Sequence, residues 1–152
     1  MATTVNEALK DLVLINHDRY QGYKKAAEET KDADLKSLFT SLSTQSLGYA
    51  QALKGHLTDG TDDLDPDNTR IDGKLYRVYM DLKAAVTGHD RKAILSSCEY
   101  GEDVAQKNYK EALEDLTEEG GYSNDVIQMV QNQKAELKQA HDRIKMLRDS
   151  SN

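Results

Sequence analysis

The sequence has few of the residues that stabilise small folds other than helical ones. It contains one cysteine, so neither a disulfide framework nor a zinc site built from several thiolates can form. One proline and nine glycines are too few for the many turns of an all-β protein. Tryptophan is absent and phenylalanine occurs once, so leucine, alanine and eight tyrosines must build the core. These absences favour one helical domain over residues 1–152.

Positive charge is also scarce. Lys and Arg number 20 against 27 Asp and Glu, which gives a formal net charge of −7 and argues against binding to nucleic acid or an anionic membrane. The longest early apolar run covers residues 12–15, far below the ~20 residues of a membrane-spanning helix. The first residues show no basic segment followed by a long apolar one, so no secretory signal is visible. We therefore expect a cytoplasmic protein.

Apolar residues recur every three or four positions along four segments, which is the spacing of amphipathic helices. The segments cover roughly residues 5–30, 33–57, 91–119 and 124–147. Thr4 and Glu7 have the spacing of a capping box, and Asp32, Asp90 and Ser123 precede the other three segments as N-cap residues. The sequence therefore predicts four helices of about 25 residues, each roughly 38 Å long.

The connections between these helices differ in length. Only a few residues join the first two helices and the last two, so each pair should form an antiparallel hairpin. Residues 59–89 separate the pairs and hold an acidic loop around Pro66 and a short extra helix at 74–86. This pattern predicts an all-α four-helix bundle with a long, ferritin-like crossover. The alternative is an up-down-up-down bundle whose third helix is kinked near Gly88.

The extra helix carries apolar residues on one side, and the bundle need not cover all of them. An exposed apolar patch of this kind usually marks an interface, and closed symmetric dimers are the commonest assembly. We therefore expect a homodimer. The sequence does not identify any other protein partner.

Three stretches resemble a known family. They are LINHDRYQGYKKAAEETKDADLKSLF, YMDLKAAVTGHDRKAILSSCEYGED and KAELKQAHDRIKMLRD, and their most specific parts are residues 98–103 and 141–143. These stretches resemble a family of small bacterial four-helix-bundle proteins of the ferritin-like superfamily, catalogued as a domain of unknown function. The resemblance implies a ferritin-like fold and a bacterial source. It implies no activity.

A ferritin-like di-iron centre requires a Glu from each of two helices and a Glu-x-x-His motif from each of the other two. The chain has four histidines: His17, His56, His89 and His141. The residues three positions before them are Leu14, Leu53, Val86 and Lys138, and none of these is a carboxylate. We therefore expect no complete di-metal site and no cofactor.

Several polar side chains nevertheless fall on the predicted inner faces near mid-helix, at about 100° per residue. They are Asn16, Arg19, Gln45, Glu102 and His141, and Glu99 lies at the edge of its helix face. One interpretation is a buried polar network in which Arg19 pairs with Glu102, because a buried carboxylate needs a partner. The other is an iron or zinc site made of Glu99, Glu102 and His141. We favour the network, since an inward arginine repels a divalent cation.

Two classes of function remain. The first is a non-enzymatic structural or interaction protein that acts through its surface and lacks a complete di-metal site. The second is a metal-binding ferritin-like protein, with iron or zinc, in iron handling or oxidative stress. We prefer the first, because the ligand positions of a di-metal centre are not filled. Cys98, on the predicted inner face, is interpreted as a small buried apolar residue.

Overall fold

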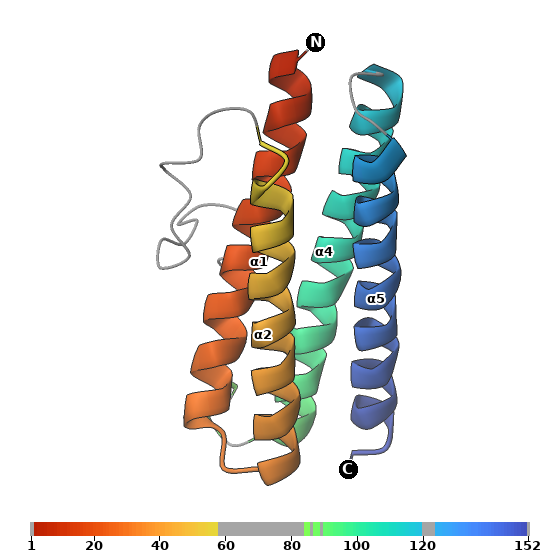
Figure 1. The fold of residues 1–152 in the computed structure, drawn as a ribbon. Coiled ribbons are helices and arrows are strands. Elements are labelled where there is room, and N and C mark those ends of the chain that lie inside the picture. The colour runs from red at the N-terminus through yellow and green to blue at the C-terminus, as the bar shows by residue number, and fades with distance from the viewer. Residues whose placement is uncertain (1, 58–83, 86, 89, 120–123, 152) are drawn as a thin grey trace.

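Four long α-helices make up the fold in the computed structural model (Figure 1). The structure describes residues 2–57, 84, 85, 87, 88, 90–119 and 124–151. The helices are α1 (Ala2–Glu29), α2 (Ala33–Lys54), α4 (Arg91–Glu119) and α5 (Asn124–Asp149), labelled as in Figure 1. No strand occurs among the described residues. The prediction of an all-α chain with four long helices is confirmed.

The predicted helix ends are close to the observed ones, with three differences. Helix α1 begins at Ala2, ahead of the predicted cap at Thr4, and α2 ends at Lys54 rather than near residue 57. Asp32 has the extended backbone of an N-cap, but its side chain makes no capping hydrogen bond. Asp90 caps α4 as predicted, because its Oδ1 accepts a hydrogen bond from the Ala93 amide at 3.1 Å.

Two expectations concern the segment between α2 and α4. The acidic loop around Pro66 lies outside the described residues. Most of the predicted extra helix at 74–86 lies outside them as well, although residues 84 and 85 are helical. The Ser123 cap also falls outside the described part of the chain.

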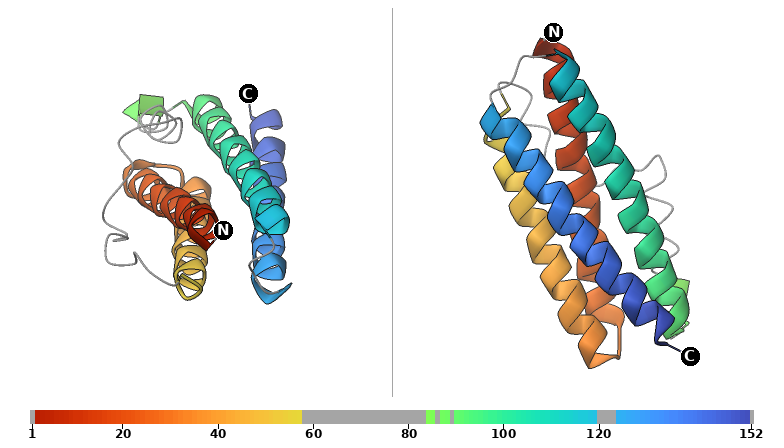
Figure 2. Two further views of the ribbon diagram at one scale, coloured as in Figure 1. Left: turned by 90° about the horizontal axis from the view of Figure 1, so that it is seen from above. Right: turned by 90° about the vertical axis from the view of Figure 1, so that its right-hand side faces the viewer.

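The helices form two antiparallel hairpins that pack side by side (Figure 2). A three-residue turn, 30–32, joins α1 to α2, so these helices lie against each other along their length. Helix α1 also packs against α4, and α4 packs against α5. Helices α2 and α4 run in the same direction, up the page in Figure 1.

No helix in the described part of the chain is long and apolar enough to span a membrane.

The core consists of two apolar clusters with a polar layer between them. The first cluster surrounds the N-terminal half of α1 and includes Leu9, Leu12 and Leu137. The second surrounds the C-terminal half of α1 and includes Phe39 and Ile144. Buried polar residues lie between the clusters: Asn16, Arg19, Ser46, Glu102 and Gln133. The helices therefore meet through polar contacts at mid-height, whereas their ends are held by apolar packing.

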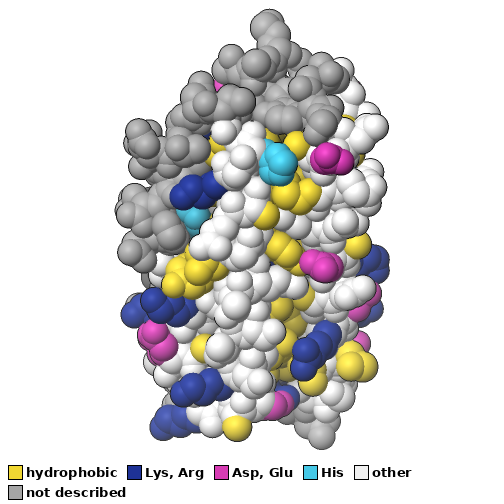
Figure 3. Space-filling model, in the orientation of Figure 1, with side chains coloured by type: hydrophobic (Ala, Val, Ile, Leu, Met, Phe, Trp, Pro, Cys, Tyr) yellow, Lys and Arg dark blue, Asp and Glu magenta, His cyan; other side chains and the backbone are white. Residues whose placement is uncertain are grey.

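The two hairpins also meet along α2 and α5, which form the face shown in Figure 3. Apolar side chains gather along the line between these helices in that view. The Tyr49 hydroxyl donates a hydrogen bond to Glu136 across the same line. Ala140 and Leu147 of α5 are partly buried there against the second cluster.

Arg91, at the start of α4, contacts the other segments at the lower end of the bundle. Arg91 forms ion pairs with Asp34 at 2.6 Å and with Asp32 at 3.4 Å, so α4 is held to the α1–α2 turn. Its Nε also donates a hydrogen bond to Ser151 near the C-terminus at 3.3 Å. These groups are half-exposed or exposed, so each pair contributes little to the stability of the fold.

Candidate functional site

The polar layer is built around an ion pair between Arg19 of α1 and Glu102 of α4. Arg19 Nε donates to Glu102 Oε2 at 3.0 Å, and Arg19 Nη2 donates to Glu102 Oε1 at 2.8 Å. Both side chains are almost completely buried, at 3% and 1% exposure. The two parallel hydrogen bonds match the fork of a guanidinium to a carboxylate, which is the strongest geometry for such a pair.

The remaining polar atoms of the pair also have partners. The Tyr23 hydroxyl donates to Glu102 Oε2 at 3.0 Å, so the carboxylate accepts three hydrogen bonds in all. Arg19 Nη1 donates to Ser46 Oγ of α2 at 2.7 Å, and Ser46 Oγ donates to the Leu42 carbonyl. The pair therefore links three helices and leaves neither oxygen of Glu102 without a donor.

Aromatic rings cover the side of the ion pair that faces the second apolar cluster. The guanidinium carbon of Arg19 lies 5.5 Å from the centre of the Tyr23 ring, within the range of a cation–π contact. Tyr23 stacks in turn on Phe39, with ring centres 5.7 Å apart. Tyr23 thus contributes an apolar body to the core and a hydroxyl to the polar layer, as buried tyrosines commonly do.

A second chain of hydrogen bonds lies one turn away from the ion pair. Asn16 Nδ2 donates to the Tyr109 hydroxyl at 2.8 Å and to the Leu12 carbonyl at 2.9 Å. The Tyr109 hydroxyl then donates to Gln133 Oε1 of α5 at 2.7 Å. All three polar residues are buried, so α1, α4 and α5 are joined at this level.

The pKa shifts follow from burial beside the charged pair. Burial alone would lower the pKa of Arg19, but Glu102 outweighs it and raises that pKa. Burial, together with the negative charge of Glu102, raises the pKa of Tyr23 and of the Cys98 thiol. Burial also raises the pKa of Tyr109. Arg19 therefore stays charged, whereas the two tyrosines and the thiol keep their protons at neutral pH.

Arg19 and Glu102 form the buried ion pair, and Asn16 belongs to the separate hydrogen-bond chain with Tyr109 and Gln133. Gln45 is half-buried next to Ser46, and its Oε1 has no hydrogen-bond partner among the described residues. No hydrogen bond joins Gln45 to the ion pair within the described part of the chain.

His141 does not belong to this network, contrary to its predicted place on the inner face. Its side chain is 19% exposed and lies where α4 and α5 meet the solvent. Nε2 lies 2.8 Å from Asp103 Oδ1, and Nδ1 lies 3.1 Å from Asp142 Oδ1. The predicted and observed directions of the His141 side chain differ by a small angle. At 100° per residue, His141 lies about 40° around the helix axis from Leu137. That rotation is enough to direct the imidazole at the outer edge of α4.

Glu99 also has its partner outside the polar layer. One carboxylate oxygen, Oε1, forms an ion pair with Arg148 near the end of α5. The other oxygen, Oε2, is buried and has no hydrogen-bond partner among the residues that the structure describes. Glu99, Glu102 and His141 therefore each face a different group: Arg148, Arg19 and Asp103 respectively.

The donor set does not suit a metal ion. The carboxylate of Glu102 already accepts three hydrogen bonds, and the cation nearest to it is the guanidinium of Arg19. Among the residues that the structure describes, no group of three or more His, Cys, Asp and Glu side chains lies close enough to hold a metal ion.

Sequence reasoning missed several buried polar residues. Tyr109 was expected only as a core residue, and Gln133 was not singled out. Gln133 lies three residues after Val130 and four before Leu137, so the helical spacing that identified Asn16 would also have found it. His17 and Asp18 of α1 are buried too, at 1% and 7% exposure. They lie off the apolar stripe of α1, and no feature of the sequence indicated their burial.

Residues 4–115 match the model of a family described as a domain of unknown function, DUF2383. No curated protein matches the sequence. Because the matched range covers most of the chain, the chain belongs to the DUF2383 family. The range contains Arg19, Glu102 and their partners Tyr23 and Ser46, whereas α5 lies beyond it.

Removing one member of the buried pair should be strongly destabilising. We expect Glu102→Ala to lower the free energy of unfolding by ~3–5 kcal/mol, because Arg19 would keep a buried charge without a partner. The double variant Arg19→Met/Glu102→Leu should recover much of that loss. Urea unfolding followed by circular dichroism measures both changes.

The matched control for this comparison is Asp149→Ala, which removes an exposed partner of Arg148. The urea midpoint should then change little, because exposed ion pairs contribute little. A Glu102→Ala protein that unfolds at the wild-type midpoint would contradict the importance of the pair.

The raised pKa values predict a loss of stability at alkaline pH. The usual pKa is ~8.5 for cysteine and ~10 for tyrosine, so the unfolded chain releases these protons first as the pH rises. Since the native state keeps the protons of Cys98, Tyr23 and Tyr109, the free energy of unfolding should fall above about pH 9 and more steeply above about pH 10.

Urea midpoints measured between about pH 8 and pH 11 test this slope. The variant Tyr23→Phe removes one of the titrating groups and should flatten the curve above about pH 10. Tyr100 is 53% exposed, so Tyr100→Phe is the matched control and should leave the slope as in the wild type. Equal slopes in all three proteins would exclude Tyr23 as a cause.

Proposed function

We propose that this DUF2383 protein is a non-enzymatic, ferritin-like bundle that acts through its surface as a structural or interaction protein. A protein-borne ion pair occupies the place in the core where a ferritin-like protein would hold metal. The protein needs no cofactor, works in the cytoplasm of a bacterium and assembles with its own kind.

The path of the chain supports the ferritin-like part of the proposal. The second and third long helices, α2 and α4, run in the same direction, so the end of α2 and the start of α4 lie at opposite ends of the bundle, as in the ferritin-like variant. An up-down-up-down bundle would instead place α2 and α4 antiparallel. The helix directions therefore favour the crossover variant over the bundle with a kinked third helix.

The observation that carries the functional part is the set of hydrogen bonds that the Glu102 carboxylate accepts. A metal ligand needs lone pairs directed at the ion, and three of the roughly four lone-pair sites of this carboxylate accept hydrogen bonds from Arg19 and Tyr23 instead. Arg19 adds a full positive charge at hydrogen-bond distance, which disfavours a second cation nearby. With the interior filled in this way, the surface is where this protein can recognise other molecules.

Elemental analysis tests the proposal. The protein is purified without chelator and without metal-affinity chromatography, and its iron and zinc contents are measured. We expect less than one tightly bound transition metal per chain. A matched sample of His141→Ala, which removes a half-buried histidine outside the ion pair, should have the same content as the wild type.

Two outcomes would overturn the proposal and promote a metal-binding protein. A stoichiometric metal that is lost in His141→Ala would indicate a site with Glu99, Glu102 and His141, formed after rearrangement of their present partners. A stoichiometric metal that persists in that variant would instead indicate the acidic loop with Asp63, Asp65 and Asp67.

A further inference from the structure

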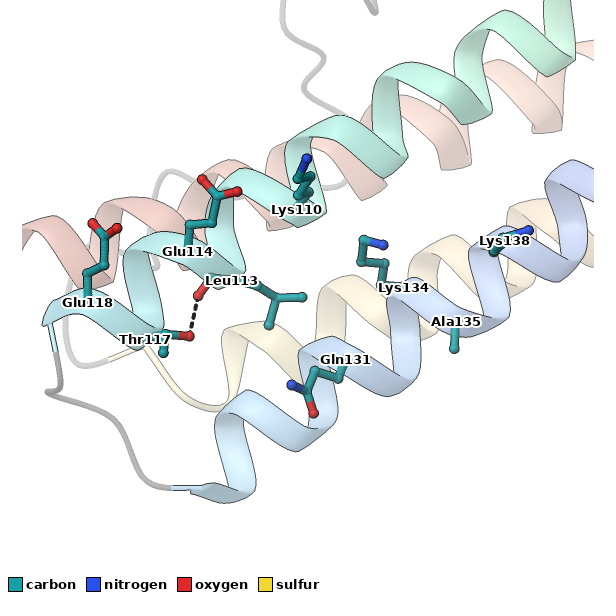
Figure 4. A pocket seen from close by; sticks show the side chains of 9 residues that line it. All are labelled: Lys110, Leu113, Glu114, Thr117, Glu118, Gln131, Lys134, Ala135 and Lys138. Carbon is teal, nitrogen blue, oxygen red and sulfur yellow. Dashed lines mark hydrogen bonds between the residues drawn. The ribbon is translucent and has the colours of Figure 1, made fainter.

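A groove runs along the outer face of the second hairpin, between α4 and α5 (Figure 4). Helix α4 lines it with Lys110, Leu113, Glu114 and Glu118, and helix α5 adds Lys134 and Lys138. In Figure 4 the two glutamates lie toward one end of the groove, whereas the lysines lie from its middle to the other end. The groove therefore has an acidic end and a basic end, with Leu113 between them.

Like charges are neighbours at each end of the groove. Glu114 and Glu118 are four residues apart on α4, and Lys134 and Lys138 are four residues apart on α5. Side chains at this spacing are neighbours on a helix, and like charges there are destabilising. The sign changes in the middle of the groove, where Lys110 lies four residues before Glu114.

In the described part of the chain, one of these charges has an ion-pair partner. Lys138 pairs with Asp142 at 3.1 Å on the side away from the glutamates. Within the described ranges, Lys110, Lys134, Glu114 and Glu118 take part in no ion pair, although all four belong to the wall of the groove. These four charges are available to a partner.

We propose that this groove is the contact surface for a second copy of the chain. A two-fold axis in the contact plane, perpendicular to the line from the acidic to the basic end, places each end against its opposite on the partner. Lys110 and Lys134 of one copy then face Glu114 and Glu118 of the other, and the same contacts recur by symmetry. Leu113, half-buried between the ends, meets its own copy near the axis.

The overall charge of the chain makes this local complementarity necessary. Two copies with a formal charge of −7 each repel one another. Screening at physiological salt limits that repulsion to about 8 Å, whereas groups in contact still interact strongly. A self-complementary face with its own basic end is therefore suited to bringing two acidic chains together. The inference rests on the proposed function, because it names the partner that the surface recognises.

A charge-swap experiment tests the contact. The acidic-groove variant is Lys110→Glu/Lys134→Glu, and the basic-groove variant is Glu114→Lys/Glu118→Lys. Each variant alone should place like charges against each other in the dimer, so its association constant should fall at least about tenfold. An equimolar mixture should restore association, because each end of one variant then faces the opposite charge on the other. Sedimentation velocity distinguishes the 17.0 kDa chain from a species of twice that mass.

The controls change the net charge by the same amount elsewhere. Lys25→Glu/Lys31→Glu matches the acidic-groove variant, and Glu28→Lys/Glu29→Lys matches the basic-groove variant, since these exposed residues lie at the other end of the bundle. The association constants of the control proteins should reflect only the change in net charge. Circular dichroism establishes that every variant is folded before its mass is measured.

Two results would overturn the inference. The first is a wild-type protein that sediments only as a single chain at high concentration. The second is a mixture of the two groove variants that associates no better than either variant alone. A wild type that is only a single chain would also remove self-assembly from the proposed function, whereas a mixture that fails to associate while the wild type dimerises rejects this contact alone. Neither result bears on metal content, which tests the rest of the proposed function separately.

Discussion

The arrangement of this bundle depends on one desolvated ion pair between its two hairpins. Arg19 and Glu102 lie on helices that no short turn connects, and both lose their hydration in the folded state. An isolated charge in such a place costs several kcal/mol, which is returned only if the geometry is good and the other polar atoms are satisfied. Ser46 and Tyr23 meet that second condition, so their polar contacts follow from burying the pair.

The pair also addresses a problem that apolar packing leaves open. The 30–32 turn sets the register of α1 against α2, but no short turn sets the register of the first hairpin against the second. Leucine and alanine faces tolerate a slip of one helical turn, about 5.4 Å, at modest cost. A bidentate pair between α1 and α4 does not tolerate it, and the Asn16–Tyr109–Gln133 chain extends the same constraint to α5. Buried polar groups of this type are best understood as determinants of register.

The helices and the Arg19–Glu102 pair could be predicted from the sequence, because both depend on the helical periodicity of its apolar residues. Amphipathic spacing located four helices, and rotation by 100° per residue directed Arg19 and Glu102 inward. The same rule was wrong for His141, since an error of about 40° separates the inner face from the helix edge. It could not place His17 and Asp18, which lie off the apolar stripe of α1 and are nevertheless buried. Which side of a helix is covered depends on the packing of the other segments, and helical periodicity does not contain that information.

Charge has opposite roles inside and outside this bundle. In the core, the unlike charges of Arg19 and Glu102 are in contact, and Ser46 and Tyr23 make further hydrogen bonds to them. On the outer face of α4 and α5, like charges are neighbours at each end of a groove, and the sign changes in its middle, where Lys110 lies four residues before Glu114. A surface under selection for stability alone would intersperse the signs, because i,i+4 pairs of opposite charge stabilise a helix. In the core, charge therefore holds the helices of one chain in register. In the groove, charges are separated in the way expected of a surface that recognises another molecule.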